Sequence, residues 1–311
     1  MTVLLASEAL PLPSYRSWIA EQERTLRQEY EWSGLRAALD RQPAESIYPA
    51  VEFAALEQAI SDDRCLQIAY TSGVETIRGF LVLPPGPARR SPAVVYARGG
   101  SLDFGSIGIG SLLDFVRLAN SDYVVLATQY RGGPGSTGQD EFGGGDVDDL
   151  LNLIPLLRAR ADVDPRNIFA WGASRGGMMT MLALRQGFRP RAVALRAPML
   201  DLNETARQRD DMRANFQKLM PDYPPDPEAA LRRRSALAWA QLLPPLPMLL
   251  LHGDSDHRVP VTQSVRLQTA LRELGRSVEL HIYESEGHLL LLNRSDYLNR
   301  VCDWFDKHRT N

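Results

Sequence analysis

Short apolar stretches alternate with helix-like stretches along most of the chain. The stretches that predict buried strands are 93–96, 124–128, 168–171, 192–195, 248–251 and 278–283. Between them, apolar residues recur at the spacing of one helix face near 112–119, 147–157 and 262–274, and a last helix is expected to end near His308. Such alternation is typical of a mostly parallel sheet with helices on both faces, so the pattern predicts an α/β fold.

Two β-patterned stretches precede this alternation. Residues 66–70 and 77–83 are rich in strand-forming side chains, and the turn sequence Thr71-Ser72-Gly73 lies between them. A turn of this kind joins neighbouring strands that run in opposite directions. The two stretches therefore predict an antiparallel pair that opens the sheet.

The chain also contains two regions without strand character. Residues from about 14 to 60 are rich in Glu, Arg, Ala and Leu and are interrupted at Pro43 and Pro49, which predicts a helical N-terminal extension over 1–62. The main domain is then expected over 63–311. Within it, the segment from 201 to 243 predicts a small cap insertion at about 201–245.

Composition narrows the class of protein. The chain has 311 residues, 44% of them hydrophobic, and a net charge of −3, so neither nucleic-acid binding nor membrane binding is expected, and Arg232–Arg234 are placed on the solvated side of a helix. Cys65 and Cys302 lie far apart without metal-like spacing, which indicates a reduced, cytoplasmic protein without a bound metal. Glu8 interrupts the apolar start, which argues against a signal peptide, and no apolar run is long enough for a bilayer.

The most informative motif is Gly172-Ala173-Ser174-Arg175-Gly176, which places a serine inside G-x-S-x-G. The motif lies between the strand predicted at 168–171 and a helical stripe that begins at Met178. A sharp strand-to-helix turn needs glycines because neighbouring backbone segments come too close for a Cβ. The pattern therefore predicts a nucleophile elbow, provided that an acid and a histidine follow in chain order.

Two aspartates compete for the role of the acid. Asp254 and Asp256 lie in the loop after the strand predicted at 248–251, at the edge of the sheet where parallel strands end. Either carboxylate could orient a histidine, and either could instead form the turn or cap the helix that begins near Pro260. The residues alone leave both aspartates as candidates.

One of the five histidines fits the role of the base. His252 precedes the acid, His257 adjoins it, His281 lies inside a strand and His308 lies at the end of the chain. His288 follows the last predicted strand in a loop with a flexible glycine, in the order expected after a serine and an acid. We therefore predict His288 as the general base.

These motifs together resemble the α/β-hydrolase superfamily and, within it, the catalytic domain of the prolyl oligopeptidase family. The stretches that carry the resemblance are 130–133, 144–149, 171–177, 252–260 and 286–288. In the family the acid is the aspartate three residues after a His-Gly pair, which implies Asp256 here and leaves Asp254 as a loop former. Arg258 resembles the arginine with which prolyl oligopeptidase itself holds a substrate carbonyl; a solvated loop arginine is the alternative.

Two departures from the family pattern affect the expected site. Arg98 stands before Gly99-Gly100, where family members usually have tyrosine or histidine. The resemblance implies an oxyanion hole made of the Arg175 backbone N–H and a second donor from the Arg98–Ser101 loop, with Gly99 and the Arg98 guanidinium as candidates. The chain also has no room for the β-propeller of large members, so the cap and the N-terminal helices are expected to gate the site.

The predicted function is that of a serine hydrolase without a metal or organic cofactor. His288 takes the proton of Ser174 with the help of Asp256, and the serine attacks an ester or amide carbonyl to form an acyl-enzyme. The expected partner is a short peptide or a small-molecule ester, and a homodimer is one of the oligomeric states left open. A carboxylesterase and a non-catalytic ligand-binding protein are the alternatives.

Overall fold

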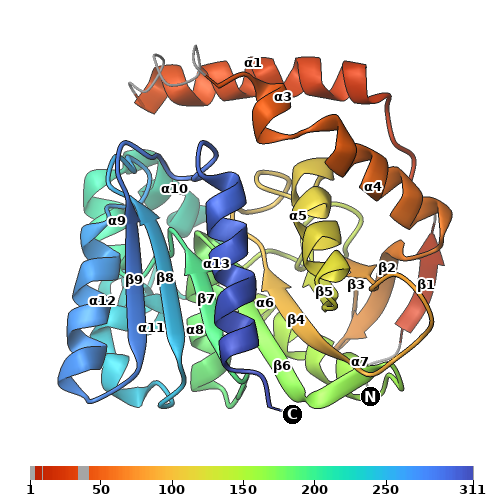
Figure 1. Cartoon of the computed structure of the whole chain (residues 1–311). Helices are drawn as coiled ribbons and strands as arrows, with labels where there is room; N and C mark the ends of the chain where they lie inside the picture. The colour runs from red at the N-terminus through yellow and green to blue at the C-terminus, as the bar shows by residue number, and fades with distance from the viewer. Residues whose placement is uncertain (1–3, 9, 34–41, 311) are drawn as a thin grey trace.

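The computed structural model describes residues 4–8, 10–33 and 42–310. In these residues nine strands form one sheet in the order β1-β2-β3-β5-β4-β6-β7-β8-β9 (Figure 1). The strands are β1 Leu4–Glu8, β2 Cys65–Ser72, β3 Glu75–Val82, β4 Ser91–Ala97, β5 Val124–Thr128, β6 Val163–Ala173, β7 Val193–Arg196, β8 Met248–Gly253 and β9 Val278–Tyr283. Strands β1 to β3 pair antiparallel and β4 to β9 pair parallel, which confirms the predicted fold class.

Helices cover both faces of this sheet. Those on one face are α4 Ala50–Ser61, α5 Ile109–Asn120 and α13 Arg294–Lys307, and those on the other are α6 Asp146–Leu151, α7 Leu153–Arg158, α8 Arg175–Arg185 and α12 Thr262–Glu273. In β4, Ala93 and Val95 belong to one core and Val94 and Tyr96 to the other, as the period of two in a strand requires. A strand buried on both faces is continuously apolar, which is why the short apolar stretches located the strands.

The predicted helix over residues 147–157 is divided into α6 and α7 in the structure. Pro155 has no N–H to donate to the carbonyl of Leu151, and its ring crowds that carbonyl. The helical hydrogen bonding is therefore interrupted at Asn152, between the two helices.

The N-terminal region contains a strand as well as helices. Strand β1 pairs antiparallel with β2 and occupies the edge of the sheet, where it satisfies backbone groups that would otherwise be unpaired. Helices α1 Tyr15–Ser33, α3 Ala44–Ile47 and α4 follow, and residues 34–41 of the predicted helical stretch lie outside the described residues. The centroid of the Trp18 ring lies 5.2 Å from that of Tyr48 and 5.5 Å from that of Phe53, so aromatic contacts fasten α1 to the elements that follow it.

The segment between β7 and β8 is helical. Its elements are α9 Leu202–Gln208, α10 Asp210–Leu219, α11 Pro227–Arg234 and the 3-10 turns Ala236–Ala238 and Ala240–Leu242. Arg234 departs from the expectation for the Arg232–Arg234 run, because it is only 5% exposed and donates to the carbonyl of Phe142 over 2.8 Å. The helix turns this one arginine inward, where Asp222 pairs with it.

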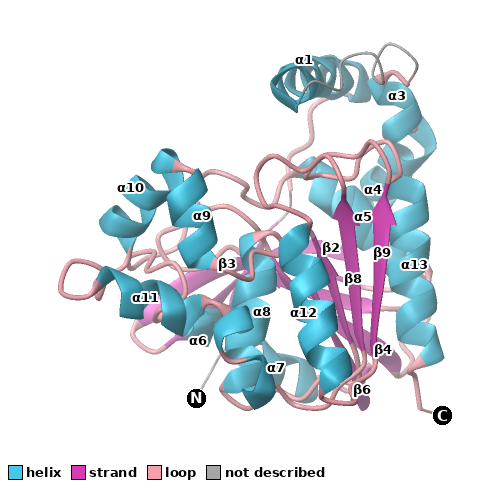
Figure 2. Ribbon diagram, turned by 90° about the vertical axis from the view of Figure 1, so that its left-hand side faces the viewer, coloured by secondary structure: helices cyan, strands magenta, loops and turns pink. Residues whose placement is uncertain are grey.

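The parallel strands β8 and β9 point toward the end of the molecule where α1 lies (Figure 2). Loops that leave the carboxyl ends of parallel strands meet at the same edge of the sheet. The residues singled out after β6, β8 and β9 therefore approach one another there. No helix in the described part of the chain is both long and apolar enough to cross a membrane.

Candidate active site

Ser174 lies at a sharp turn between β6 and α8. Its φ angle is +55°, a left-handed conformation that a serine adopts only when its surroundings impose it. A Cβ on Gly172 would lie 2.6 Å from the carbonyl oxygen of Gly176, and a Cβ on Gly176 would overlap the carbonyl oxygen of Ala97. The two glycines thus let the turn close tightly, as expected from the motif.

Asp256 and His288 are joined by a short hydrogen bond. His288 Nδ1 lies 2.7 Å from Asp256 Oδ2, and the backbone N–H groups of Arg258 and Val259 donate to Asp256 Oδ1 over 2.8 and 2.9 Å. Burial alone would raise the pKa of Asp256, but the charge of His288 and the hydrogen bonds from His252 and His288 hold it well below its usual range. The carboxylate is therefore ionised and able to orient the imidazole.

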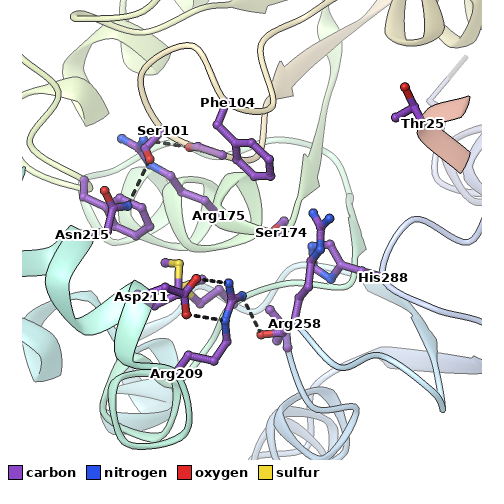
Figure 3. Close-up of a pocket in the computed structure, with 15 residues that line it drawn as sticks. Thr25, Ser101, Phe104, Ser174, Arg175, Arg209, Asp211, Asn215, Arg258 and His288 are labelled. Carbon is purple, nitrogen blue, oxygen red and sulfur yellow. Dashed lines mark hydrogen bonds and ion pairs between the residues drawn. The ribbon is translucent and has the colours of Figure 1, made fainter. Parts of the chain in front are cut away.

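The position of His288 leaves its second ring nitrogen for the serine. Nδ1 is engaged by Asp256, and both His288 and Ser174 line the same cavity (Figure 3). His288 itself is only 7% exposed, so most of its ring is shielded from bulk water. The structure therefore brings the predicted nucleophile, acid and base to one place.

The competing aspartate has a different role. Asp254 Oδ1 accepts the backbone N–H of Ser285 over 2.8 Å and the hydroxyl of Ser255 over 2.9 Å. It ties the loop after β8 to the loop after β9. This contact agrees with the role of loop former that the resemblance implies for Asp254.

His252 contacts Asp256, a contact that sequence reasoning missed. Its Nε2 lies 3.1 Å from Asp256 Oδ2 and 2.9 Å from the carbonyl of Val259, and its Nδ1 lies 2.8 Å from the hydroxyl of Ser264. Two acceptors at Nε2 place the ring proton there, so Ser264 donates to Nδ1. The sequence did offer a signal for this contact, because His252 lies at the end of a strand, four residues before Asp256.

The oxyanion side differs from expectation at Arg98. The Arg98 guanidinium, one of the predicted oxyanion donors, is instead engaged by backbone carbonyls. It donates to the carbonyls of Gln129 and Leu102 over 2.9 and 2.8 Å and to two further carbonyls of its own loop. Gly99 does lie against the nucleophile, since a Cβ there would stand 3.1 Å from Ser174 Cβ. Arg175 is the first residue of α8, and the N–H groups in the first turn of a helix have no acceptor within the helix.

The cavity beside Ser174 has a volume of about 740 Å³, and residues from several parts of the chain line it (Figure 3). Thr25 contributes from α1, Ser101 and Phe104 from the loop after β4, and Phe142 from the loop after β5. The remaining wall comes from Ser174 and Arg175 after β6, from the cap and from the loops after β7, β8 and β9. The residues with apolar side chains that line it are Phe104, Phe142, Met199, Met212 and Val259. The cavity is thus lined by apolar side chains together with polar and charged ones.

Helix α10 of the cap and Arg209, which immediately precedes it, contact both sides of the cavity. Asn215 Nδ2 donates to Ser101 Oγ over 3.1 Å, while Arg209 donates to the carbonyl of Arg258 over 3.4 Å and to Asp211 over 3.2 Å. Arg258 itself lines the cavity, with its guanidinium carbon 5.6 Å from the centre of the Phe104 ring. Charged groups therefore lie on the cap side of the cavity.

A profile of the prolyl oligopeptidase family matches residues 111–311, which is more than half of the chain. The chain belongs to the prolyl oligopeptidase family. It is 28% identical over 226 residues to the "Uncharacterized peptidase YtmA" of Bacillus subtilis, which covers 72% of this chain and 86% of that protein. The family assignment and the shared fold make the chain a serine hydrolase.

Two solved structures of the same fold have longer chains than this prolyl oligopeptidase family member. An acylaminoacyl peptidase of Pyrococcus horikoshii has a TM-score of 0.68 and 21% identity, with 78% of this chain and 41% of that chain covered. A puromycin-hydrolysing peptidase of Mycobacterium tuberculosis has a TM-score of 0.65 and 23% identity, with 75% of this chain and 37% of that chain covered. The chain therefore spans about two fifths of the length of these solved peptidases.

The family match divides the site of this prolyl oligopeptidase family member. Ser174, Asp256 and His288 fall inside the matched residues 111–311. Thr25 and the loop that contains Arg98 and Gly99 fall outside them.

Proposed function

We propose that this prolyl oligopeptidase family member hydrolyses amide bonds of short peptides, with Ser174 as nucleophile, His288 as general base and Asp256 as acid. The observation that supports the assignment best is the 2.7 Å hydrogen bond between His288 Nδ1 and Asp256 Oδ2 at the cavity that contains Ser174. The two solved structures described above are both named as peptidases, which also supports this proposal.

The proposed reaction begins when His288 Nε2 takes the proton of Ser174 Oγ and the oxygen attacks the substrate carbonyl carbon. Negative charge then forms on the carbonyl oxygen, where the N–H of Arg175 is a proposed donor. His288 returns the proton to the leaving nitrogen, and a water molecule repeats these steps on the acyl-enzyme. Asp256 remains ionised and stabilises the imidazolium, in keeping with the low pKa of its carboxyl.

The shape of the cavity supports small substrates. A volume of about 740 Å³ fits the size range of small-molecule sites. We propose that residues 1–62 act as an extension whose α1 limits the cavity at Thr25, that 63–311 form the catalytic domain, and that the cap at about 201–245 limits the opposite side. Folded proteins would then be excluded, and short peptides admitted.

Ester hydrolysis is the second candidate because apolar side chains form part of the lining of the cavity. Side chains such as Phe142 and Met199 would accommodate an acyl chain as readily as an apolar amino-acid side chain. Arg258, by contrast, can donate to a peptide carbonyl, which favours a peptide in the same cavity. We also propose a reducing, cytoplasmic location, because Cys65 and Cys302 are free thiols.

Matched substrates separate the two candidates. An N-acylaminoacyl p-nitroanilide and the p-nitrophenyl ester of the same acyl amino acid differ only in the leaving group. We expect both to be hydrolysed, and Ser174→Ala to lower kcat/KM by roughly 10⁴- to 10⁶-fold on both. Ester hydrolysis without anilide hydrolysis would favour the carboxylesterase, and activity retained in Ser174→Ala would refute the triad.

A further inference from the structure

Two arginine side chains lie buried beneath the loop that follows β4. Arg98 and Arg175 are each 1% exposed, although arginine is seldom fully buried without a specific partner. The ring of Tyr130 lies next to both, with each guanidinium carbon 5.3 Å from its centroid. The two guanidinium groups therefore occupy one site in the interior, directly behind the active-site loop.

The donors of these guanidinium groups are directed at the carbonyls of that loop. Arg98 donates to Gly99 over 3.0 Å, to Leu102 over 2.8 Å and to Phe104 over 3.2 Å. Arg175 donates to Gly100 over 2.9 Å. Four carbonyl groups in a stretch of six residues thus point inward, to fixed positive charges.

Two carboxylates balance the charge and take part in the same arrangement. Arg175 donates to both oxygens of Asp140 over 2.7 Å and also to Asp146, and Asp140 in turn accepts the N–H of Leu102 over 3.0 Å. Burial, and next the charge of Arg175, lower the pKa of Arg98 to about 10, which still leaves it protonated at neutral pH. The loop is therefore held by a buried network of ions, and every ion in it has a partner that fixes its position.

Inward carbonyls imply outward N–H groups. In a trans peptide the C=O of one residue and the N–H of the next point in opposite directions. The inward carbonyls of Gly99 and Gly100 therefore turn the N–H groups of Gly100 and Ser101 toward the other side of the loop, and both of these residues line the cavity that contains Ser174. Gly100 can adopt this path because its φ is +65°, a region open to glycine.

We propose that Arg98 and Arg175 are positioning residues that hold the backbone N–H groups of this loop toward the oxyanion opposite the N–H of Arg175. This inference rests on the proposed function, and it assigns the second donor to the loop backbone rather than to the Arg98 side chain. Fixed donors stabilise the transition state because they need no reorganisation as the charge forms. The arginine that stands before Gly99, in place of the usual tyrosine or histidine, then serves to hold the carbonyls of this loop inward.

The test uses Arg98→Met, which keeps an unbranched apolar stem but removes every hydrogen-bond donor of the side chain. We expect kcat to fall by roughly 10²-fold with KM changed by less than about threefold, because the lost contacts act on the transition state. A peptide aldehyde, which forms a tetrahedral adduct with Ser174, should lose affinity by a similar factor. The product carboxylic acid, which forms no such adduct, should bind as it does to the wild type.

Arg294→Met is the matched control. Arg294 is 3% exposed and pairs with Asp114 and Glu52, none of which lines the cavity. We expect this variant to lower the melting temperature without changing kcat. If Arg98→Met and Arg294→Met affect kcat, KM and aldehyde affinity alike, Arg98 is only a structural residue and the inference is wrong.

A second variant covers the case in which Arg98→Met does not fold. Arg98→Lys keeps the charge but has fewer donors in a different geometry, so it cannot hold the three loop carbonyls that Arg98 holds, those of Gly99, Leu102 and Phe104, in the same way. We expect its kcat to lie below that of the wild type at unchanged KM; a kcat equal to that of the wild type would contradict the inference. If the Ser174→Ala variant keeps its activity, the proposed function is refuted instead. Failure of the inference about Arg98 and failure of the proposed function are therefore distinguishable.

Discussion

The two sides of the active site are built in different ways. On the triad side, Ser174, Asp256 and His288 each follow the end of a strand within a few residues, so the sheet itself brings them together. On the oxyanion side, the loop after β4 is shaped by buried ions that come from segments far apart in the chain, above all Arg175 and Asp140. In the proposed mechanism, the topology places the reacting atoms, while buried charge sets the orientation of the oxyanion donors.

The largest expected effect falls on the triad side. Asp256→Asn should lower kcat by roughly 10⁴-fold, because an amide cannot hold His288 in the tautomer that accepts the serine proton. Asp254→Asn is the matched control in the same loop and should leave kcat close to that of the wild type. Steady-state kinetics on one anilide substrate measures both. A large loss in the Asp254 variant would mean that the wrong aspartate has been assigned as the acid.

The next effect tests the buried ions. Asp140→Asn removes one partner of a pair that is fully buried, which typically costs about 3–5 kcal/mol of unfolding free energy. Burial would raise the pKa of Asp140, but Arg175 and the backbone donors lower it, so its stabilising contribution is present above the ordinary pKa and is lost as the pH falls. Urea unfolding at neutral and acidic pH should show a smaller acid-induced loss in the variant. An equal loss in both proteins would contradict the assigned network.

A smaller effect concerns the link between the cap and the oxyanion loop. Asn215→Ala removes the hydrogen bond to Ser101, and a neutral hydrogen bond of this kind contributes about 0.5–1.5 kcal/mol. We expect KM to rise a few-fold with little change in kcat. Gln217→Ala, at an exposed position of the same helix, is the control and should change neither constant. If both variants behave alike, the contact does not shape the cavity.

The smallest effect concerns stability near the base. Glu286 is fully buried, and its Oε1 accepts the backbone and side-chain N–H groups of Asn293 over 2.7 and 2.9 Å, which closes the loop that contains His288. Burial raises the pKa of Glu286, so its contribution to stability is present at low pH and is lost as the pH rises through the raised pKa. The unfolding free energy of Glu286→Gln should lack that decline. Parallel pH dependence in the two proteins would contradict this reading.

Sequence reasoning reached the triad side more completely than the oxyanion side for a physical reason. Ser174 and His288 could be proposed from the sequence because short apolar strands and chain order are local patterns, whereas the choice of Asp256 needed the family resemblance. The interior role of Arg98 could not be read in this way, because its partners are backbone carbonyls whose positions depend on the folded loop. Arg234 was misplaced for a similar reason, since only the folded cap shows which arginine of the run turns inward.

Some features were within reach of the sequence. Pro155 inside the predicted helix was a visible signal for the break between α6 and α7. Strand β1 was not, because its five residues carry too little periodicity and owe their conformation to the edge of β2. Local rules therefore recovered the strands of the parallel sheet, and tertiary pairing decided the edge.

The most direct test of the central claim is the intact mass of the folded protein after reaction with a fluorophosphonate. The account predicts one adduct per chain, located on the peptide that contains Ser174, and its absence in Ser174→Ala. It also predicts much slower labelling in His288→Ala, where no base activates the hydroxyl. An unlabelled wild type, or a single adduct on another residue, would contradict the assignment of Ser174 as the nucleophile.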